Sequence, residues 1–179
     1  MLRVRAWMAG LGLDVDVRDA PLRLVDVPPP ARDASEVREP ARTLTEELRR
    51  TDPFGRTTVT RSITGVEVVR GLTRVHYGSL VAHELTHAWV FLADVGLPSG
   101  PVEEGVAELV RWYWLRSRDE AEAAYWADAM EQNRDPVYGE GFRWVRARYG
   151  GEPLAVFIRS LGTSAGGVSP SGGGPAPRR

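Results

Sequence analysis

The chain has no cysteine and no lysine, and only three of its 179 residues are histidine. The lack of cysteine excludes disulfides and zinc modules with cysteine ligands, and it fits a reducing compartment. The N-terminal run has two early arginines and a short apolar stretch, but it reaches Asp14 without a small-residue cleavage site. We therefore expect no signal peptide and a cytoplasmic protein.

Long hydrophobic runs and a large net charge are also missing. No segment is long enough to cross a membrane. The formal net charge of −1 gives no electrostatic reason to bind nucleic acid or a membrane surface. The composition, 42% hydrophobic and 26% charged, is that of a soluble globular protein. We expect one domain over residues 1–163 and a disordered Gly/Ser/Pro tail over residues 164–179.

Two of the three histidines belong to the motif His83-Glu84-Leu85-Thr86-His87. Residues four apart on a helix project from the same face, so His83 and His87 can bind one metal ion. Apolar residues flank the motif on both sides, which predicts a buried helix whose polar side chains need partners. Glu84 would point into the space beside the metal. The alternative, a chance match on an ordinary helix, is disfavoured by this context.

An acidic segment one loop further on supplies the expected third ligand. Pro101 suits the first position of a helix, and on that helix Glu103 and Glu104 lie about 100° apart, so both cannot reach one metal. We choose Glu104, because Gly105 permits a close approach to a facing helix, and we expect Glu103 to be an ordinary surface charge. Glu108 either accepts a hydrogen bond from a ligand histidine or is a surface charge too. Three protein ligands leave the fourth position open, as in catalytic zinc sites.

Three further residues could contribute. Tyr138 either donates a hydrogen bond to a developing oxyanion or is a packed aromatic at the start of a helix. His76 is expected to be an ordinary residue of the loop before the motif helix. Arg143 either binds a substrate carbonyl or, as we expect, pairs with Glu140 on a helix surface.

The pattern along the chain predicts an α+β fold, with a small N-terminal β-sheet followed by a mostly helical part. We expect a strand at 21–27, one or two helical turns within 43–50, and a hairpin of strands 57–63 and 66–70 that turns at Thr64-Gly65. Helices are expected at 79–94, 101–117, 119–133, 136–149 and 152–161, with Asp119 as an N-cap and Gly150-Gly151 as a break. A strand just before the motif helix could pair with an extended substrate.

Three blocks of sequence carry a family resemblance. They are H-E-L-T-H-A-W at 83–89, V-E-E-G-V-A-E-L at 102–109 and D-P-V-Y-G-E-G-F-R at 135–143. In this order they resemble the peptidase domain of the DA1 family, which forms the C-terminal part of larger plant proteins. The resemblance extends over most of residues 14–163.

The resemblance implies a zincin-like fold of the gluzincin type and a zinc-dependent endopeptidase that acts on protein or peptide substrates. His83, His87 and Glu104 would be the zinc ligands and Glu84 the general base. The plant relatives also carry ubiquitin-interacting segments and cysteine-rich LIM modules. A chain without cysteine cannot hold a LIM module, so the ubiquitin link is not carried over. The alternative function is a protein-binding module that keeps the zincin scaffold with little or no turnover.

Overall fold

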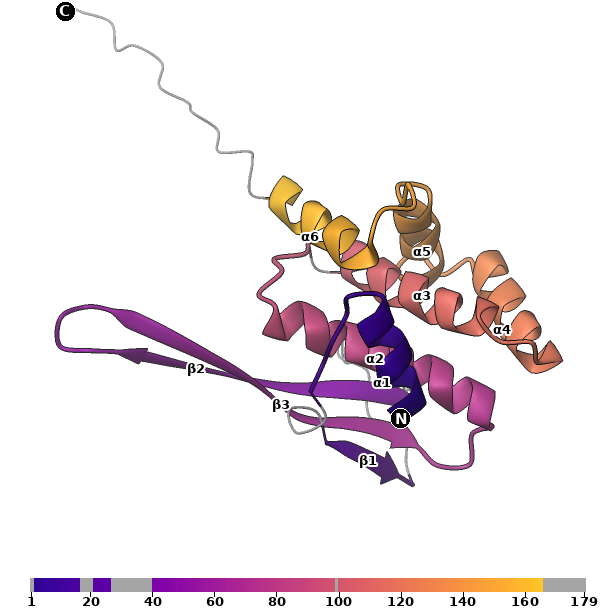
Figure 1. The fold of residues 1–179 in the computed structure, drawn as a ribbon, viewed down its shortest axis with the longest axis horizontal. Coiled ribbons are helices and arrows are strands. Elements are labelled where there is room, and N and C mark those ends of the chain that lie inside the picture. Colours follow the sequence, from indigo (N-terminus) through magenta and orange to yellow (C-terminus); the bar gives the residue numbers. More distant parts are fainter. Residues whose placement is uncertain (1, 17–20, 27–39, 99, 166–179) are drawn as a thin grey trace, which may run out of the picture.

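The computed structural model describes residues 2–16, 21–26, 40–98 and 100–165, with side chains as far as residue 162. In chain order the elements are α1 (Leu2–Gly10), β1 (Leu22–Val25), β2 (Ala41–Thr51), β3 (Thr57–Val69), α2 (Arg74–Leu92), α3 (Pro101–Arg116), α4 (Ala121–Gln132), α5 (Tyr138–Arg146) and α6 (Leu154–Ala165). A small sheet is followed by a mostly helical part, so the predicted α+β class is confirmed (Figure 1).

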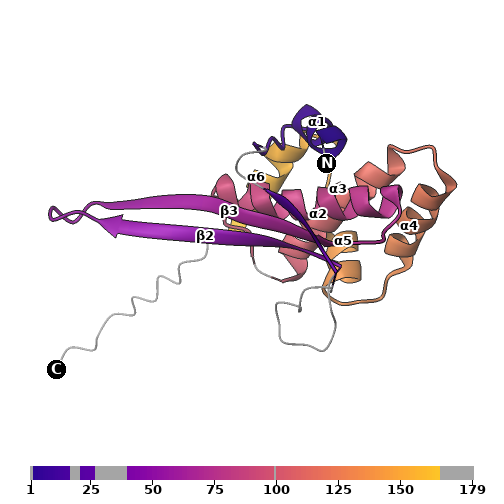
Figure 2. The same ribbon diagram turned by 90° about the horizontal axis from the view of Figure 1, so that it is seen from below.

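The sheet has three strands in the order β1-β3-β2, with β1 parallel and β2 antiparallel to β3. Helix α2 packs only against the part of the sheet that is distant from the tip of the β2–β3 hairpin. The outer half of the β2–β3 hairpin is exposed and projects beyond the helices, as Figures 1 and 2 show. The hairpin tip is closed by Asp52, whose Oδ1 accepts hydrogen bonds from the main-chain N–H groups of Phe54 and Arg56 at 2.8 and 2.9 Å.

The hairpin predicted at Thr64-Gly65 is wrong, because one strand runs through both residues. Leu44 of β2 faces Gly65 and Thr45 faces Ile63, so Thr64 is an extra residue opposite the β2 strand. The pair therefore forms a β-bulge, which is a common use of glycine inside a strand.

The helical turns expected within residues 43–50 are also wrong, because this segment belongs to β2. Its leucines, glutamates and arginines favour a helix, but pairing along β3 overrides the local preference. A helix that the sequence did not predict, α1, forms at the N-terminus, and its Val4 and Met8 side chains are buried.

The five helices predicted downstream are confirmed, with shifted ends. The motif helix α2 starts earlier than expected, at Arg74, because Thr73 accepts a hydrogen bond from the main-chain N–H of His76. Asp119 is not the N-cap of α4, since that helix starts at Ala121 after Glu120. The last helix, α6, continues to Ala165, and the rest of the expected tail, residues 166–179, lies outside the described residues.

α2 is the central helix of the fold. It contacts β2 and β3 of the sheet, and also α1, α3 and α4. Its residues from Ser79 to Val90 are all buried. None of the helices within the described residues is long and apolar enough to cross a membrane.

Two glycines allow α3 and α5 to cross closely. A Cβ atom on Gly105 of α3 would lie 2.4 Å from the carbonyl oxygen of Gly141. A Cβ atom on Gly141 of α5 would lie 2.1 Å from the carbonyl oxygen of Pro101. Gly105 therefore permits the close approach expected of it, but the helix it faces is α5 rather than the motif helix.

Candidate metal centre

The motif places three polar side chains inside the molecule. His83, Glu84 and His87 lie on α2 and are only 7%, 5% and 6% exposed. Buried polar groups are retained where they have partners, and here the partners come from α3 and β2.

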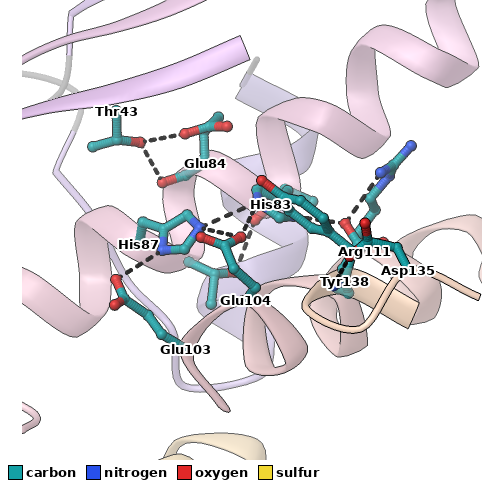
Figure 3. Close-up of polar contacts among 12 residues, drawn as sticks. Thr43, His83, Glu84, His87, Glu103, Glu104, Arg111, Asp135 and Tyr138 are labelled. Atoms are coloured by element: carbon teal, nitrogen blue, oxygen red, sulfur yellow. Dashed lines mark hydrogen bonds and ion pairs between the residues drawn. The ribbon is translucent and has the colours of Figure 1, made fainter. Parts of the chain in front are cut away.

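Three ligand atoms converge between α2 and α3 (Figure 3). The Nε2 atoms of His83 and His87 are 3.1 Å apart, and the Glu104 Oε2 lies 3.3 Å from the first and 3.4 Å from the second. His83, His87 and Glu104 form a group that could hold a metal ion. The structure thus brings together the three residues chosen from the sequence as ligands.

The Nδ1 atoms of His83 and His87 have carboxylate partners, which affect whether the Nε2 atoms can bind a metal ion. The Nδ1 of His83 lies 2.8 Å from the Glu108 carboxylate, and the Nδ1 of His87 lies 3.3 Å from that of Glu103. A carboxylate favours a proton on the nitrogen that faces it, which leaves a lone pair on Nε2. When both rings are neutral, two lone pairs and the Glu104 carboxylate would then face one another, and such a group of acceptors could hold a cation.

The same groups shift the pKa values of the site. Burial lowers the pKa of His83, but hydrogen bonds to Glu104 and Glu108 outweigh it and raise the pKa to about 10. The pKa of His87 is raised against burial by Glu103 and Glu104. Burial raises the pKa of Glu104, yet the two histidines hold it well below its usual range.

The spacing of the ligand atoms fits a tetrahedral metal ion. Bonds of about 2.0–2.2 Å in tetrahedral geometry hold ligand atoms about 3.3–3.6 Å apart. The observed separations of 3.1, 3.3 and 3.4 Å are close to this range. Two imidazoles and one carboxylate are also a common ligand set of zinc.

Glu84 lies next to this group but is not part of it. Its side chain points toward Thr43 of β2, whose Oγ1 lies 2.8 Å from both the Oε2 and the main-chain oxygen of Glu84 (Figure 3). Thr43 is itself only 6% exposed. The hydroxyl is within hydrogen-bond distance of both acceptors and links the Glu84 carboxylate to the sheet. Thr43 could not be recognised from the sequence, because no motif connects it with a residue 41 positions away.

Glu108 is placed by a second residue that the sequence analysis missed. Arg111 donates from its guanidinium to the Glu108 Oε1 at 3.1 Å. Burial raises the pKa of Glu108, but the charge of Arg111 and the bond with His83 lower it to about 2. Glu108 is therefore a buried, ionised carboxylate that orients the imidazole ring of His83. Glu103, expected to be a surface charge, contacts His87 instead.

The remaining candidates are on or near α5 and α2. Asp135 accepts the main-chain N–H of Tyr138 at the start of α5, and the Tyr138 ring extends toward His83 and Glu104 in Figure 3. His76 lies in the first turn of α2, not in a loop, and stacks on Trp126 with ring centres 4.2 Å apart. The expected pairing of Arg143 with Glu140 is not what the structure shows, because the Arg143 guanidinium donates to the main-chain oxygens of residues 131 and 133.

The fold and the site define an α+β protein with a candidate His-His-Glu metal centre between two packed helices. The family model described as "DA1-like: Protein DA1" matches residues 34–125, which is more than half of the chain. The chain belongs to the DA1-like family. The matched region contains the three ligand candidates, Glu84 and Thr43, but it ends before Tyr138.

Individual relatives are more distant. The chain is 28% identical to Protein DA1 of Arabidopsis thaliana over 109 residues, which is 45% of this chain and 20% of that protein. It is 26% identical to Protein DA1-related 7 of the same plant over 130 residues, 55% of this chain and 23% of the relative. The LIM domain-containing protein HDR3 of Oryza sativa subsp. japonica is 36% identical over 55 residues, 31% of this chain and 11% of that protein. The matched parts of the chain thus span about a fifth of the length of the first two relatives and about a tenth of the third. No solved structure matches the chain.

Proposed function

We propose that the protein is a zinc-dependent endopeptidase. The proposal rests on the convergence of His83, His87 and Glu104 as candidate metal ligands. Beside them lies a second buried carboxylate, Glu84, which is not one of these ligands. Three protein ligands leave a position for water and substrate, whereas a purely structural site is usually closed by four. A site that served stability alone would have no use for a fourth, separately held carboxylate.

Each residue of the site would have a separate role in peptide hydrolysis. A bound zinc ion would lower the pKa of a water molecule toward 7 and polarise the peptide carbonyl. Glu84 would accept the proton of the attacking water and pass it to the leaving amine. Glu108 and Glu103 would keep the two imidazole rings oriented through Nδ1. Tyr138 is the candidate donor to the oxyanion, because its ring extends toward the ligand group.

The sheet supports the binding of an extended substrate. The sequence suggested the strand just before the motif helix, but that strand, β3, lies in the middle of the sheet. The edge strand beside the site is β2, since its residue Thr43 contacts Glu84. A peptide that adds to β2 would be held by its backbone, with little demand on its sequence. Unfolded protein segments are therefore the proposed substrates.

The test uses zinc-loaded protein and an unfolded protein as substrate. We expect cleavage that a chelator stops and zinc restores. Glu84→Gln keeps the size of the side chain but cannot accept the proton, so cleavage should fall by about 10² to 10⁴ while zinc content stays constant. Equal cleavage by Glu84→Gln would overturn the mechanism. Zinc binding without cleavage by the parent protein would favour the alternative, a binding module on the same scaffold.

A further inference from the structure

A cavity of about 580 Å³ lies between α1, the first turns of α2 and the end of α3. Its walls include Arg3 of α1, Arg74 and Gly78 of α2, and Trp114 and Arg118 near the end of α3. Its volume is within the range of small-molecule sites, about 300–1,000 Å³. None of its lining residues belongs to the candidate metal centre.

The charge of this cavity is positive. Arg3, Arg74 and Arg118 line it together with one carboxylate, Glu120. Glu120 is engaged by Arg74 at 3.2 Å. Within the described part of the chain, Arg3 and Arg118 have no carboxylate partner. Two guanidinium groups are therefore available to an anion.

Two buried donors in the same wall have no acceptor. The Nε1 of Trp114, a residue only 5% exposed, and the Nε of Arg118 make no hydrogen bond within the described residues. The Arg118 guanidinium lies over the Trp114 ring, 4.3 Å from its centre, so the two donors are adjacent. Buried donors without partners are rare in folded proteins and call for an explanation.

Gly78 packs directly against the indole nitrogen of Trp114. A Cβ atom at this position would lie 2.9 Å from the Trp114 Nε1. Gly78 and Trp114 both line the cavity, so their contact forms part of its wall. Tyr77 and the apolar side chains of Leu2, Val4 and Val75 complete the lining.

We propose that this cavity binds a small organic anion with a carboxylate or phosphate head and an apolar body. The head would accept hydrogen bonds from the guanidinium groups of Arg118 and Arg3, which match these oxyanions in charge and geometry, and would lie beside the Trp114 ring. The body would contact Val4 and Val75. The site is separate from the proposed peptidase centre and does not depend on its activity.

The experiment follows the indole N–H signal of Trp114 in the NMR spectrum of the ¹⁵N-labelled full chain. The chain has six tryptophans, so Trp114→Phe identifies the signal by its loss. Titration with phenyl phosphate or benzoate should shift this signal in a saturable way, and the two probes compare phosphate with carboxylate heads. Benzyl alcohol, which lacks the charge, should shift it little. An equal response to benzyl alcohol, or no saturable shift with either anion at millimolar concentration, would overturn the proposal.

Two substitutions locate the anion. Arg118→Gln should weaken binding of phenyl phosphate about tenfold or more, as expected when a charged donor to an anion is lost. Arg3→Gln should weaken it too, and because Arg3 is exposed this variant folds even if Arg118→Gln does not. Arg134→Gln, on an exposed loop outside the cavity, is the matched control and should bind like the parent. Unchanged affinity in both Arg118→Gln and Arg3→Gln would exclude the site.

Discussion

At the scale of single residues, the two adjacent glutamates of α3 make different contacts. Glu104 faces both Nε2 atoms, whereas Glu103 faces the Nδ1 of His87. We therefore expect Glu104→Ala to reduce zinc from about one ion per chain to nearly none, since one of three ligands is lost. Glu103→Ala should keep the zinc with a lower affinity.

Elemental analysis of the purified variants checks the assignment. Glu108→Gln should have a zinc affinity between that of the parent and that of Glu104→Ala. Loss of a hydrogen-bond partner of a ligand histidine typically weakens metal binding about 10- to 100-fold. If Glu103→Ala loses zinc while Glu104→Ala retains it, the ligand assignment is wrong.

Thr43 allows a test of positioning at the same scale. Thr43→Val has nearly the same shape but lacks the hydroxyl that holds the Glu84 carboxylate at 2.8 Å. A hydrogen bond to a charged group contributes about 1.5–3 kcal/mol, so kcat should fall about tenfold or more. Zinc content and KM should change little, because the Thr43 hydroxyl bonds to Glu84 and not to one of the three ligands.

Thr43→Ser is the control for this substitution. It keeps the hydroxyl and should restore most of the rate in steady-state kinetics with a peptide substrate. If Thr43→Val and Thr43→Ser are equally slow, the methyl packing matters and the hydroxyl does not.

The sequence identified residues whose spacing reports a shared helix face, and it missed those that tertiary structure brings in. His83, His87 and Glu84 could be recognised together because they lie within one helical turn. Arg111, three residues after Glu108, could have been found from the i, i+3 spacing of opposite charges. Thr43 could not, since it reaches Glu84 only through the pairing of β2 with β3.

At the scale of elements, the crossing of α3 and α5 positions Glu104. Gly141→Ala would place a Cβ atom 2.1 Å from the carbonyl oxygen of Pro101, the first residue of α3. The helices must then move apart, which should cost at least about 1–3 kcal/mol of folding stability. Because Glu104 lies three residues after Pro101, zinc affinity should fall as well.

Gly10→Ala is the matched control for the crossing. Gly10 ends α1, and a Cβ there meets no atom within 4 Å. This variant should be as stable as the parent or slightly more stable. Chemical denaturation and zinc titration of both variants decide the question. A Gly141→Ala protein with unchanged stability and zinc affinity would show that the crossing has no part in holding Glu104.

The helices after residue 73 were predicted from the sequence, whereas strand β2 was not, and the reason is physical. The helices after residue 73 have apolar faces and recognisable ends, so local sequence was sufficient to find them. β2 is half exposed and rich in helix-forming residues, and its structure depends on a partner strand. The turn at Asp52 could have been recognised from Asp52-Pro53 and Gly55, which are typical turn residues.

At the scale of the whole molecule, one compact helical layer supports both the candidate metal centre and the cationic cavity. α2 connects them, since Gly78 lines the cavity and His83 follows about 7.5 Å further along the helix axis. Packing of α2 against the sheet, α1, α3 and α4 explains why polar residues on it can be buried in fixed positions.

The pH dependence of zinc binding follows from the buried charges of the whole site. The pKa of His83 is raised to about 10 and that of His87 is also raised, so at neutral pH zinc must displace protons from the rings. Each displaced proton weakens binding about tenfold per pH unit below the pKa, so zinc affinity should increase steadily from pH 6 to pH 9. Histidines with ordinary pKa values near 6.5 would give an affinity that levels off above pH 7.

Competition with a chelator of known zinc affinity, repeated at each pH, measures this slope. Glu108→Gln removes a carboxylate that raises the pKa of His83, so its slope above pH 7 should be shallower than that of the parent. Glu84→Gln keeps all three ligands and should retain a steep slope. An affinity that is constant between pH 7 and pH 9 in the parent would mean that the rings are already deprotonated, contrary to the raised pKa values.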